Sequence, residues 1–273
     1  MRKKALIIGN GYIGKRLQDA LDCPISDKRI SCYQDIAQEL ARYKPDVLIN
    51  CIGKVGRNVD QCELDIDQTL SANTFVPLIL AEAAVRHKVK LVHISSGCIF
   101  HYDYKKNIPI TENRPPDFLD LFYSRSKIYS ENALFALMKQ FPFLVLRIRV
   151  PLDNIPDPRN LLTKLIGYRK AIDLPNSVTY IPDFLQAVKH LIMRKCNGVY
   201  NVVNRGALCY PDLLDEYRKY FPEFQYEKVK FKSLGLVRTN LVLSCRKLES
   251  TGFKMRQIKA VLPECVREYV HGA

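Results

Sequence analysis

The chain has 273 residues, of which 47% are hydrophobic, and a formal net charge of +14. This length suits one large α/β unit or two unequal lobes rather than a single minimal core. No run approaches the roughly 18 uncharged apolar residues of a membrane helix, and the apolar part of the N-terminal segment MRKKALIIGN is too short for a secretory signal. We therefore expect a cytoplasmic protein with no membrane partner.

The distribution of the basic residues and of the cysteines argues against nucleic-acid binding, a disulfide framework and a metal site. The lysines and arginines are scattered and do not alternate with aromatic residues. This favours a solvated basic surface, or steering of anionic ligands, over nucleic-acid binding. The nine cysteines contain no CxxC pair, so we expect neither a disulfide framework nor a metal site.

Short apolar strands alternate with helices over the first 150 residues. The predicted strands are 4–9, 46–50, 89–95 and 143–150, and the predicted helices are 12–21, 67–88 and 124–140. Strands that are apolar on both faces and alternate with helices indicate a parallel sheet covered on both sides. We expect an α/β fold with a Rossmann-type doubly wound parallel sheet, to which 198–203 adds another strand.

The pattern changes after Pro151, where PLDNIPDPRN holds three prolines. We expect residues 1–150, with about 180–205, to form a dinucleotide-binding domain. Residues 151–180 and 206–273 are expected to form a smaller C-terminal substrate lobe.

The segment GNGYIG, residues 9–14, has GxGxxG spacing between a predicted strand and a predicted helix. Glycines there permit a tight turn and close approach of a pyrophosphate to the helix N-terminus, where free N–H groups favour anions. A tight turn without a ligand is the alternative. We expect cofactor contacts from Gly9, Asn10, Gly11, Tyr12, Ile13, Gly14, Cys51 and Gly53.

The segment PISDKRI, residues 24–30, is the candidate for reading the adenosine ribose. Asp27 suits the 2′-hydroxyl of NADH, whereas Lys28 and Arg29 suit the 2′-phosphate of NADPH. Two cations beside one acid favour NADPH, and NADH and a plain surface turn are the alternatives.

Tyr123 and Lys127 stand in YxxxK spacing, so they share a face of the predicted helix. A lysine ammonium beside a phenol stabilises the phenolate and lowers the phenol pKa. Such a phenol can protonate a carbonyl oxygen as hydride arrives. Ser96, at the end of the preceding predicted strand, can hold the same oxygen.

These motifs, with others in chain order, resemble the extended short-chain dehydrogenase/reductases and their nucleotide-sugar branch, which includes dTDP-4-dehydrorhamnose reductase. Closer still is the resemblance to the bifunctional 3,5-epimerase/4-reductases that make UDP-L-rhamnose in plants and some large DNA viruses. The sequence departs from the family pattern in two places. Its glycine turn is one residue shorter than the common GxxGxxG, and it lacks a proline after the arginine of GKVGRN. The segments that carry the resemblance are GRNVDQCE (56–63), SGCIF (96–100), FYSRSK (122–127), LRIRVP (146–151), DPRNLLTK (157–164), LPNSVT (174–179), RTN (238–240) and RKL (246–248).

The resemblance implies NADPH-dependent epimerisation at C3 and C5 of a 4-keto-6-deoxy nucleotide sugar, followed by reduction at C4. It assigns reduction to Ser96, Tyr123 and Lys127, and epimerisation to Cys98 and Lys164 as an acid/base pair. The alternatives are a simple 4-ketoreductase, in which Cys98 only packs, and a non-catalytic regulatory relative. The nucleotide is UDP or dTDP, and we expect a homodimer. Substrate contacts are assigned to Arg57, Asn58, Arg149, Arg159, Asn160, Asn176, Arg238 and Asn240.

The chemistry of epimerisation gives the thiol a function beside a complete reductive set. A 4-keto group acidifies the hydrogens on C3 and C5, and Tyr123 and Ser96 can stabilise the resulting enolate. Inversion then needs protons handled on both faces of the ring. Cys98 lies two residues beyond Ser96, and Lys164 can serve the other face if its surroundings lower its pKa. A buried thiol and a surface or phosphate-binding lysine are the plainer interpretation.

Overall fold

The computed structural model describes residues 4–56 and 58–272, which fall into two units. The first unit comprises the described residues up to Ile99 together with Phe118–Arg147 and Leu191–Tyr200. The second comprises Phe100–Asp117, Ile148–His190 and the described residues from Asn201 onward. No helix in the described ranges combines the length and apolar character needed to span a membrane.

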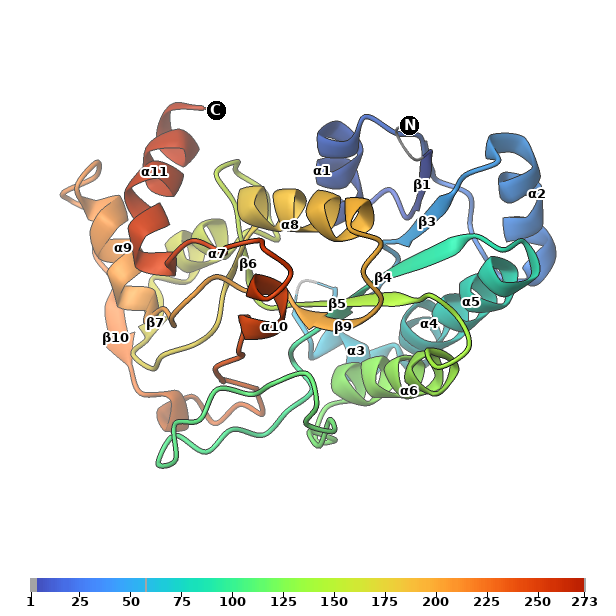
Figure 1. Ribbon diagram of the computed structural model, residues 1–273. Coiled ribbons are helices and arrows are strands. Elements are labelled where there is room, and N and C mark those ends of the chain that lie inside the picture. Colours follow the sequence, from blue (N-terminus) through green and yellow to red (C-terminus); the bar gives the residue numbers. More distant parts are fainter. Residues whose placement is uncertain (1–3, 57, 273) are drawn as a thin grey trace. The chain divides into compact units, whose positions relative to one another are not determined.

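The first unit is built on a six-stranded sheet in the order β2-β1-β3-β4-β5-β9 (Figure 1). Strand β1 pairs in parallel with β2 and β3, and β3 pairs in parallel with β4. The apolar runs at β1 and β3 are fully buried, as the sequence pattern predicts for strands covered on both faces. The strands are β1 (Ala5–Ile8), β2 (Ile25–Ser26), β3 (Val47–Asn50), β4 (Lys90–Ser96), β5 (Leu144–Ile148) and β9 (Gly198–Asn201).

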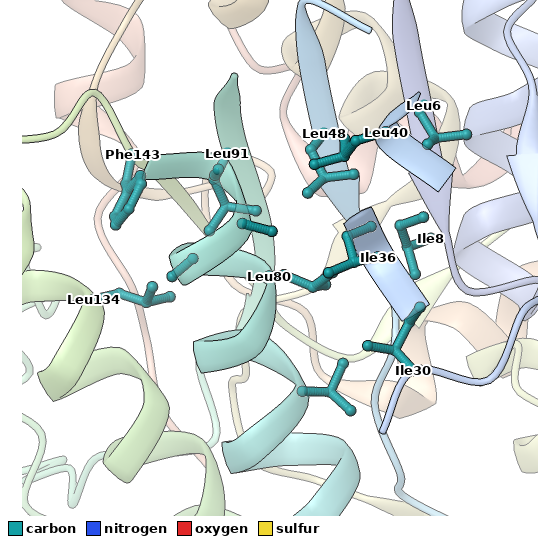
Figure 2. Close-up of a cluster of buried hydrophobic side chains, with 14 of the residues drawn as sticks. Leu6, Ile8, Ile30, Ile36, Leu40, Leu48, Leu80, Leu91, Leu134 and Phe143 are labelled. Atoms are coloured by element: carbon teal, nitrogen blue, oxygen red, sulfur yellow. The ribbon is translucent and has the colours of Figure 1, made fainter. Parts of the chain in front are cut away.

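Helices flank this sheet, and their apolar faces form the core of the unit. Leucine and isoleucine side chains of β1 and β3 meet those of α2 and α5, while Phe143 and Leu91 meet α6 (Figure 2). This packing confirms the predicted α/β class. The helices are α1 (Tyr12–Leu21), α2 (Tyr33–Tyr43), α3 (Gln61–Leu64), α4 (Ile66–Leu70), the π-helical turn η1 (Ser71–Phe75), α5 (Val76–Arg86) and α6 (Phe122–Leu137).

One predicted helix, 67–88, is divided in the structure by the π-helical turn η1. Pro77 lies in the first turn of α5. Because proline has no N–H and its ring clashes with the carbonyl four residues earlier, the regular ladder cannot continue through Asn73. A wider π turn accommodates the break.

The second unit has two small parallel pairs, β6 with β8 and β7 with β10. Its core gathers leucine and valine side chains of α7, α9 and α11. The elements are β6 (Pro151–Leu152), α7 (Leu161–Tyr168), β7 (Lys170–Ile172), β8 (Thr179–Tyr180), α8 (Ile181–Met193), α9 (Tyr210–Arg218), β10 (Glu227–Val229), the 3-10 turn η2 (Phe231–Leu234), α10 (Arg246–Glu249) and α11 (Ile258–His271).

The unit boundaries differ from those expected from sequence at 100–117, 148–150, 181–190 and 201–205, which the structure groups with the second unit. The reason for the first segment is backbone pairing. The Ile110 amide donates to the carbonyl of Val242, and the Ser244 amide donates to the carbonyl of Ile110, both at 2.8 Å. These two hydrogen bonds join the segment 100–117 to residues 242–244.

Candidate active site

The glycine turn between β1 and α1 is so tight that side chains would not fit. Gly9 has φ +109°, and a Cβ there would lie 2.8 Å from the backbone nitrogen of Ile52. A Cβ on Gly14 would lie 2.0 Å from the carbonyl oxygen of Gly9. Gly11 precedes α1, whose N-terminus has no side-chain cap. The start of α1 is thus a cradle that suits an anion.

The other predicted residues of this turn differ in exposure. Asn10 is exposed, Ile13 is half-buried and Tyr12 is buried. Cys51 and Gly53 follow β3, the neighbour of β1 in the sheet. Burial raises the pKa of the Cys51 thiol far above its ordinary value, so this cysteine is a neutral packing group rather than a nucleophile.

A cleft of about 500 Å³ opens beside the ends of β2 and β3. Arg29 and Ile30 after β2, Ile52 after β3 and Gln68 of α4 contribute to its lining. Lys28 is engaged elsewhere, because its ammonium donates to the side-chain oxygen of Gln38. Of the DKR segment, Arg29 is therefore the residue that lines the cleft, whereas Asp27 is exposed and does not.

The turn and the cleft together fit a dinucleotide. The glycine cradle suits the pyrophosphate, and the adjacent cleft suits the adenosine with a guanidinium at its wall. The carboxyl ends of parallel strands are where doubly wound folds bind such ligands.

Ser96 and Cys98 are joined by a tight turn at the end of β4. The backbone N–H of Cys98 donates to Ser96 Oγ at 3.1 Å. Since Ser96 Oγ accepts this bond, its own proton remains available to donate. The carbonyl of Cys98 accepts a 2.6 Å hydrogen bond from Ser124 Oγ, which ties the turn to the first turn of α6. Cys98 is half-buried.

Tyr123 and Lys127 both lie on α6, one turn apart. Tyr123 is half-buried and Lys127 is buried. A Cβ on Gly53 would lie 3.0 Å from Lys127 Nζ and 3.5 Å from Asn73 Oδ1. The lysine ammonium therefore reaches the backbone that follows β3, beside the Asn73 amide.

Burial lowers the pKa of Lys127 to about 8. Cys62 and Glu131 oppose the shift and raise the pKa, although burial raises the pKa of Cys62, which stays a neutral thiol near pH 7. Lys127 is thus mostly protonated at neutral pH and can stabilise a phenolate at Tyr123.

Asn73 is a site residue that sequence reasoning missed. It lies on η1, and its Oδ1 accepts from the Lys54 amide at 2.8 Å. Its Nδ2 donates to the Lys54 carbonyl at 3.0 Å and to Ser126 Oγ at 3.1 Å. It fixes the segment next to Gly53. The available signal was Pro77 within a predicted helix. A proline there breaks the regular ladder, and the π-helical turns that accommodate such breaks often occur at functional sites.

Several predicted substrate residues of the second unit are engaged in hydrogen bonds within that unit. Arg149 is 2% exposed, and its Nε donates to Asn176 Oδ1 at 3.2 Å while its Nη1 donates to Thr239 Oγ1 at 2.8 Å. Asn240 Nδ2 donates to the Pro175 carbonyl at 3.0 Å and to the Tyr104 hydroxyl. These residues build an internal polar network.

Three further predicted substrate residues are closer to the surface. Asn58 and Arg159 are exposed, and Arg238 is half-buried. These three side chains are therefore more accessible than Arg149 and Asn240. Arg57 lies outside the described residues.

The side chain of Asn160 is held within the second unit. Its Oδ1 accepts from the amides of Asp153 and Leu162, both at 3.1 Å. Its Nδ2 donates to the carbonyls of Asp153 and Ile155. All four hydrogen-bonding positions of this buried amide are used within the unit, so Asn160 caps α7 in the structure, a role that the sequence did not predict.

Lys164 lies in the first turn of the helix that Asn160 caps. It is half-buried. Burial first, and then the positive charge of Arg159, lower its pKa, while Asp157 opposes the shift. A lysine with a lowered pKa can exchange protons near neutrality more readily than an ordinary one.

The Rossmann-type sheet, with Ser96 at the end of β4 and Tyr123 and Lys127 on α6, has the arrangement of a short-chain dehydrogenase/reductase. The family model described as RmlD substrate binding domain matches residues 9–271, so the chain belongs to this family. Its relatives include nucleotide-sugar 4-keto reductases and rhamnose synthases, which confirms the resemblance inferred from the motifs.

Two relatives from Arabidopsis thaliana illustrate the relation. The bifunctional dTDP-4-dehydrorhamnose 3,5-epimerase/dTDP-4-dehydrorhamnose reductase is 31% identical, over 94% of this chain and 89% of that protein. The trifunctional UDP-glucose 4,6-dehydratase/UDP-4-keto-6-deoxy-D-glucose 3,5-epimerase/UDP-4-keto-L-rhamnose-reductase RHM1 is 30% identical, over 98% of this chain. The chain spans only 42% of the length of that second relative.

Solved structures share the fold. The L780 UDP-rhamnose synthase of Acanthamoeba polyphaga mimivirus superposes with a TM-score of 0.89 at 24% identity, covering 97% of this chain and 99% of that one. The dTDP-4-dehydrorhamnose reductase of Bacillus anthracis, solved in complex with NADP, gives a TM-score of 0.84 at 21% identity with the same coverage.

Proposed function

We propose that the chain is an NADPH-dependent enzyme that epimerises C3 and C5 of a 4-keto-6-deoxy nucleotide sugar and then reduces C4. The proposed conversion is UDP-4-keto-6-deoxyglucose to UDP-L-rhamnose. The observation that carries the proposal is the turn at the end of β4, where Cys98 is bound through its own amide to the hydroxyl of Ser96.

Reduction is assigned to α6 and the end of β4. NADPH, when bound, supplies the hydride that C4 receives. Tyr123 gives its phenolic proton to the C4 oxygen, and the Lys127 ammonium stabilises the phenolate that remains. Ser96 donates a hydrogen bond from its hydroxyl to the same oxygen, in an orientation set by the bond from the Cys98 amide.

NADPH is favoured over NADH by the position of Arg29. Its guanidinium side chain contributes to the cleft beside β2, where a 2′-phosphate of the adenosine ribose would lie, and arginine binds phosphate in bidentate fashion. The Bacillus reductase named above was solved with NADP, which agrees with this choice.

Epimerisation is assigned to Cys98 and Lys164. Loss of a proton from C3 or C5 gives an enolate whose oxygen is stabilised by Tyr123 and Ser96. The Cys98 thiol exchanges a proton with the carbon on one face of the ring. Lys164, whose pKa is lowered by burial and by Arg159, exchanges a proton on the other face. The Arabidopsis relatives carry 3,5-epimerase in their names.

The proposal is tested by incubating the purified chain with NADPH and either UDP- or dTDP-4-keto-6-deoxyglucose, and identifying the product by NMR. We expect UDP-L-rhamnose. A 6-deoxy sugar reduced at C4 with C3 and C5 unchanged would establish a simple 4-ketoreductase. NADPH binding with no turnover of either sugar would establish a non-catalytic relative.

A matched pair of variants controls the assay. Tyr123→Phe should lose reduction, whereas Tyr129→Phe, on an exposed tyrosine of the same helix, should keep it. Equal loss in both would show that α6 tolerates no change, and equal activity would remove Tyr123 from the reaction.

A further inference from the structure

A buried carboxylate lies on α6 beyond the reductive pair. Glu131 follows Lys127 by one helical turn and Tyr123 by two, so the three side chains share a face of the helix. Glu131 is 2% exposed. A carboxylate at this depth needs compensation by partners.

The partners of Glu131 come from two neighbouring strands. Its Oε1 accepts from Arg147 Nε of β5 at 2.8 Å and from the Nη2 of the same arginine. Its Oε2 accepts from Ser95 Oγ of β4 at 2.8 Å. Both partners are buried, and Ser95 directly precedes Ser96. One carboxylate thereby joins α6 to β4 and β5 beside the reacting groups.

Stability is a poor explanation for this arrangement. A buried ion pair loses much of its attraction to desolvation, and apolar residues of similar volume often stabilise a core as well or better. The cost of burying this ion pair is understandable if its charge or its fixed geometry serves the site.

Among the described residues, the side chains shown to raise the pKa of Lys127 are Cys62 and Glu131. Cys62 of α3 stays a neutral thiol, because burial raises its pKa. His93 of β4 is neutral near pH 7, since burial and the charge of Lys127 lower its pKa to about 3. Glu131 raises the pKa of Lys127 and opposes the effect of burial.

We propose that Glu131 is a positioning residue, whose carboxylate holds α6 against β4 and β5 and supplies the negative charge that keeps the Lys127 ammonium protonated. The inference rests on the proposed function in taking Tyr123 and Lys127 as the reacting pair. Hydrogen bonds from Arg147 and Ser95 hold the carboxylate in place.

The test is an NMR titration of the whole chain labelled with ¹³C at the lysine Cε, with the Lys127 signal assigned by its loss in Lys127→Met. Glu131→Gln keeps the size and the acceptor of the side chain and removes its charge. We expect the Lys127 titration to move down by about half a pH unit or more. An unchanged titration overturns the proposal.

Three further variants separate charge from folding. Glu131→Asp keeps the charge and should restore most of the titration. Glu82→Gln removes a carboxylate from an exposed ion pair with Arg86 on α5 and should leave Lys127 unchanged. If Glu131→Gln does not fold, the double variant Glu131→Leu/Arg147→Met replaces the pair by apolar side chains. It should show a smaller downward shift, because the positive charge of Arg147 is lost together with the carboxylate, and an unchanged or raised titration there also overturns the proposal.

Turnover gives the second readout. The loss of C4 reduction at high pH should begin at a lower pH in Glu131→Gln, in step with the Lys127 titration. In Glu131→Asp it should return to the original pH. Because the titration needs no substrate, its failure refutes the role of Glu131 even in an active reductase. A normal shift in a chain that reduces no keto-sugar refutes the proposed function alone.

Discussion

In the first unit, the candidate site is assembled from strand ends and one helix, whereas in the second unit several of the residues expected to bind the sugar are held by hydrogen bonds to other residues of that unit. Ser96 and Cys98 share a turn, while Arg149 is committed to Asn176 and Thr239. The first arrangement fixes the backbone around a hydroxyl and a thiol that we propose to react. The second fixes loops. The comparison shows that polar residues in matched motifs can also serve as framework.

The largest expected effect is on the reacting hydroxyl of the first unit. Tyr123→Phe should reduce the rate of C4 reduction by roughly 10²- to 10⁴-fold, since it removes the general acid. NADPH binding should stay within about twofold of the original, as measured by fluorescence titration. A variant that reduces at the original rate shows that another group protonates C4.

A second test concerns the cleft beside β2. Arg29→Ala should weaken NADPH binding by about tenfold or more and NADH binding much less, because a charge-assisted pair with the 2′-phosphate is lost. Lys28→Ala is the matched control, since that ammonium is already bound to Gln38. An equal loss of both cofactors in Arg29→Ala contradicts a role in reading the phosphate.

The buried lysine of the first unit predicts a dependence of stability on pH. Its pKa is lowered from 10.5 to about 8 in the folded chain, so between these values the unfolded state binds more protons. The contribution of Lys127 to the free energy of unfolding therefore rises with pH, by up to about 3 kcal/mol. Denaturant titrations across this window should show less rise in Lys127→Met than in Lys88→Met, where the lysine is exposed. An identical rise of the free energy of unfolding in the two variants would argue against a buried Lys127 with a lowered pKa.

The sequence pattern predicted some of the elements behind these predictions and missed others. The strands and helices around β1, β3, β4 and α6 were predictable because apolar runs and glycine or YxxxK spacing mark them. Helix α2 was given no assignment, and β2 has only two residues, too few for a periodic signal. The contacts of Asn73 and the capping role of Asn160 were not predictable in detail, since both depend on hydrogen bonds to backbone groups that the fold brings close. Pro77 marked only the neighbourhood of Asn73.

A smaller effect should follow from loosening the turn that holds the thiol. Ser124→Ala removes the bond to the Cys98 carbonyl, worth about 1 kcal/mol. We expect hydrogen exchange at C3 and C5 to fall severalfold, with less effect on C4 reduction. Ser130→Ala, a buried serine that binds the backbone of its own helix, is the control. Equal effects of the two variants would remove the special role of Ser124.

The smallest expected effect concerns charge around Lys164 in the second unit. Arg159→Gln should raise the pKa of Lys164 and Asp157→Asn should lower it, because the two charges act on it in opposite directions. Both side chains are at least partly exposed, so solvent screens the shifts to a few tenths of a pH unit. The Lys164 signal in the ¹³C titration measures them. Shifts of the same sign would contradict the assignment.

The division between epimerisation and reduction is tested most directly by NMR of UDP-4-keto-6-deoxyglucose in D₂O with the chain and without reductant. The original chain should exchange the hydrogens on C3 and C5 for deuterium. Cys98→Ala should stop that exchange while keeping its fold and its binding of NADPH. Exchange of both hydrogens at the original rate by Cys98→Ala would contradict the account and leave a simple 4-ketoreductase.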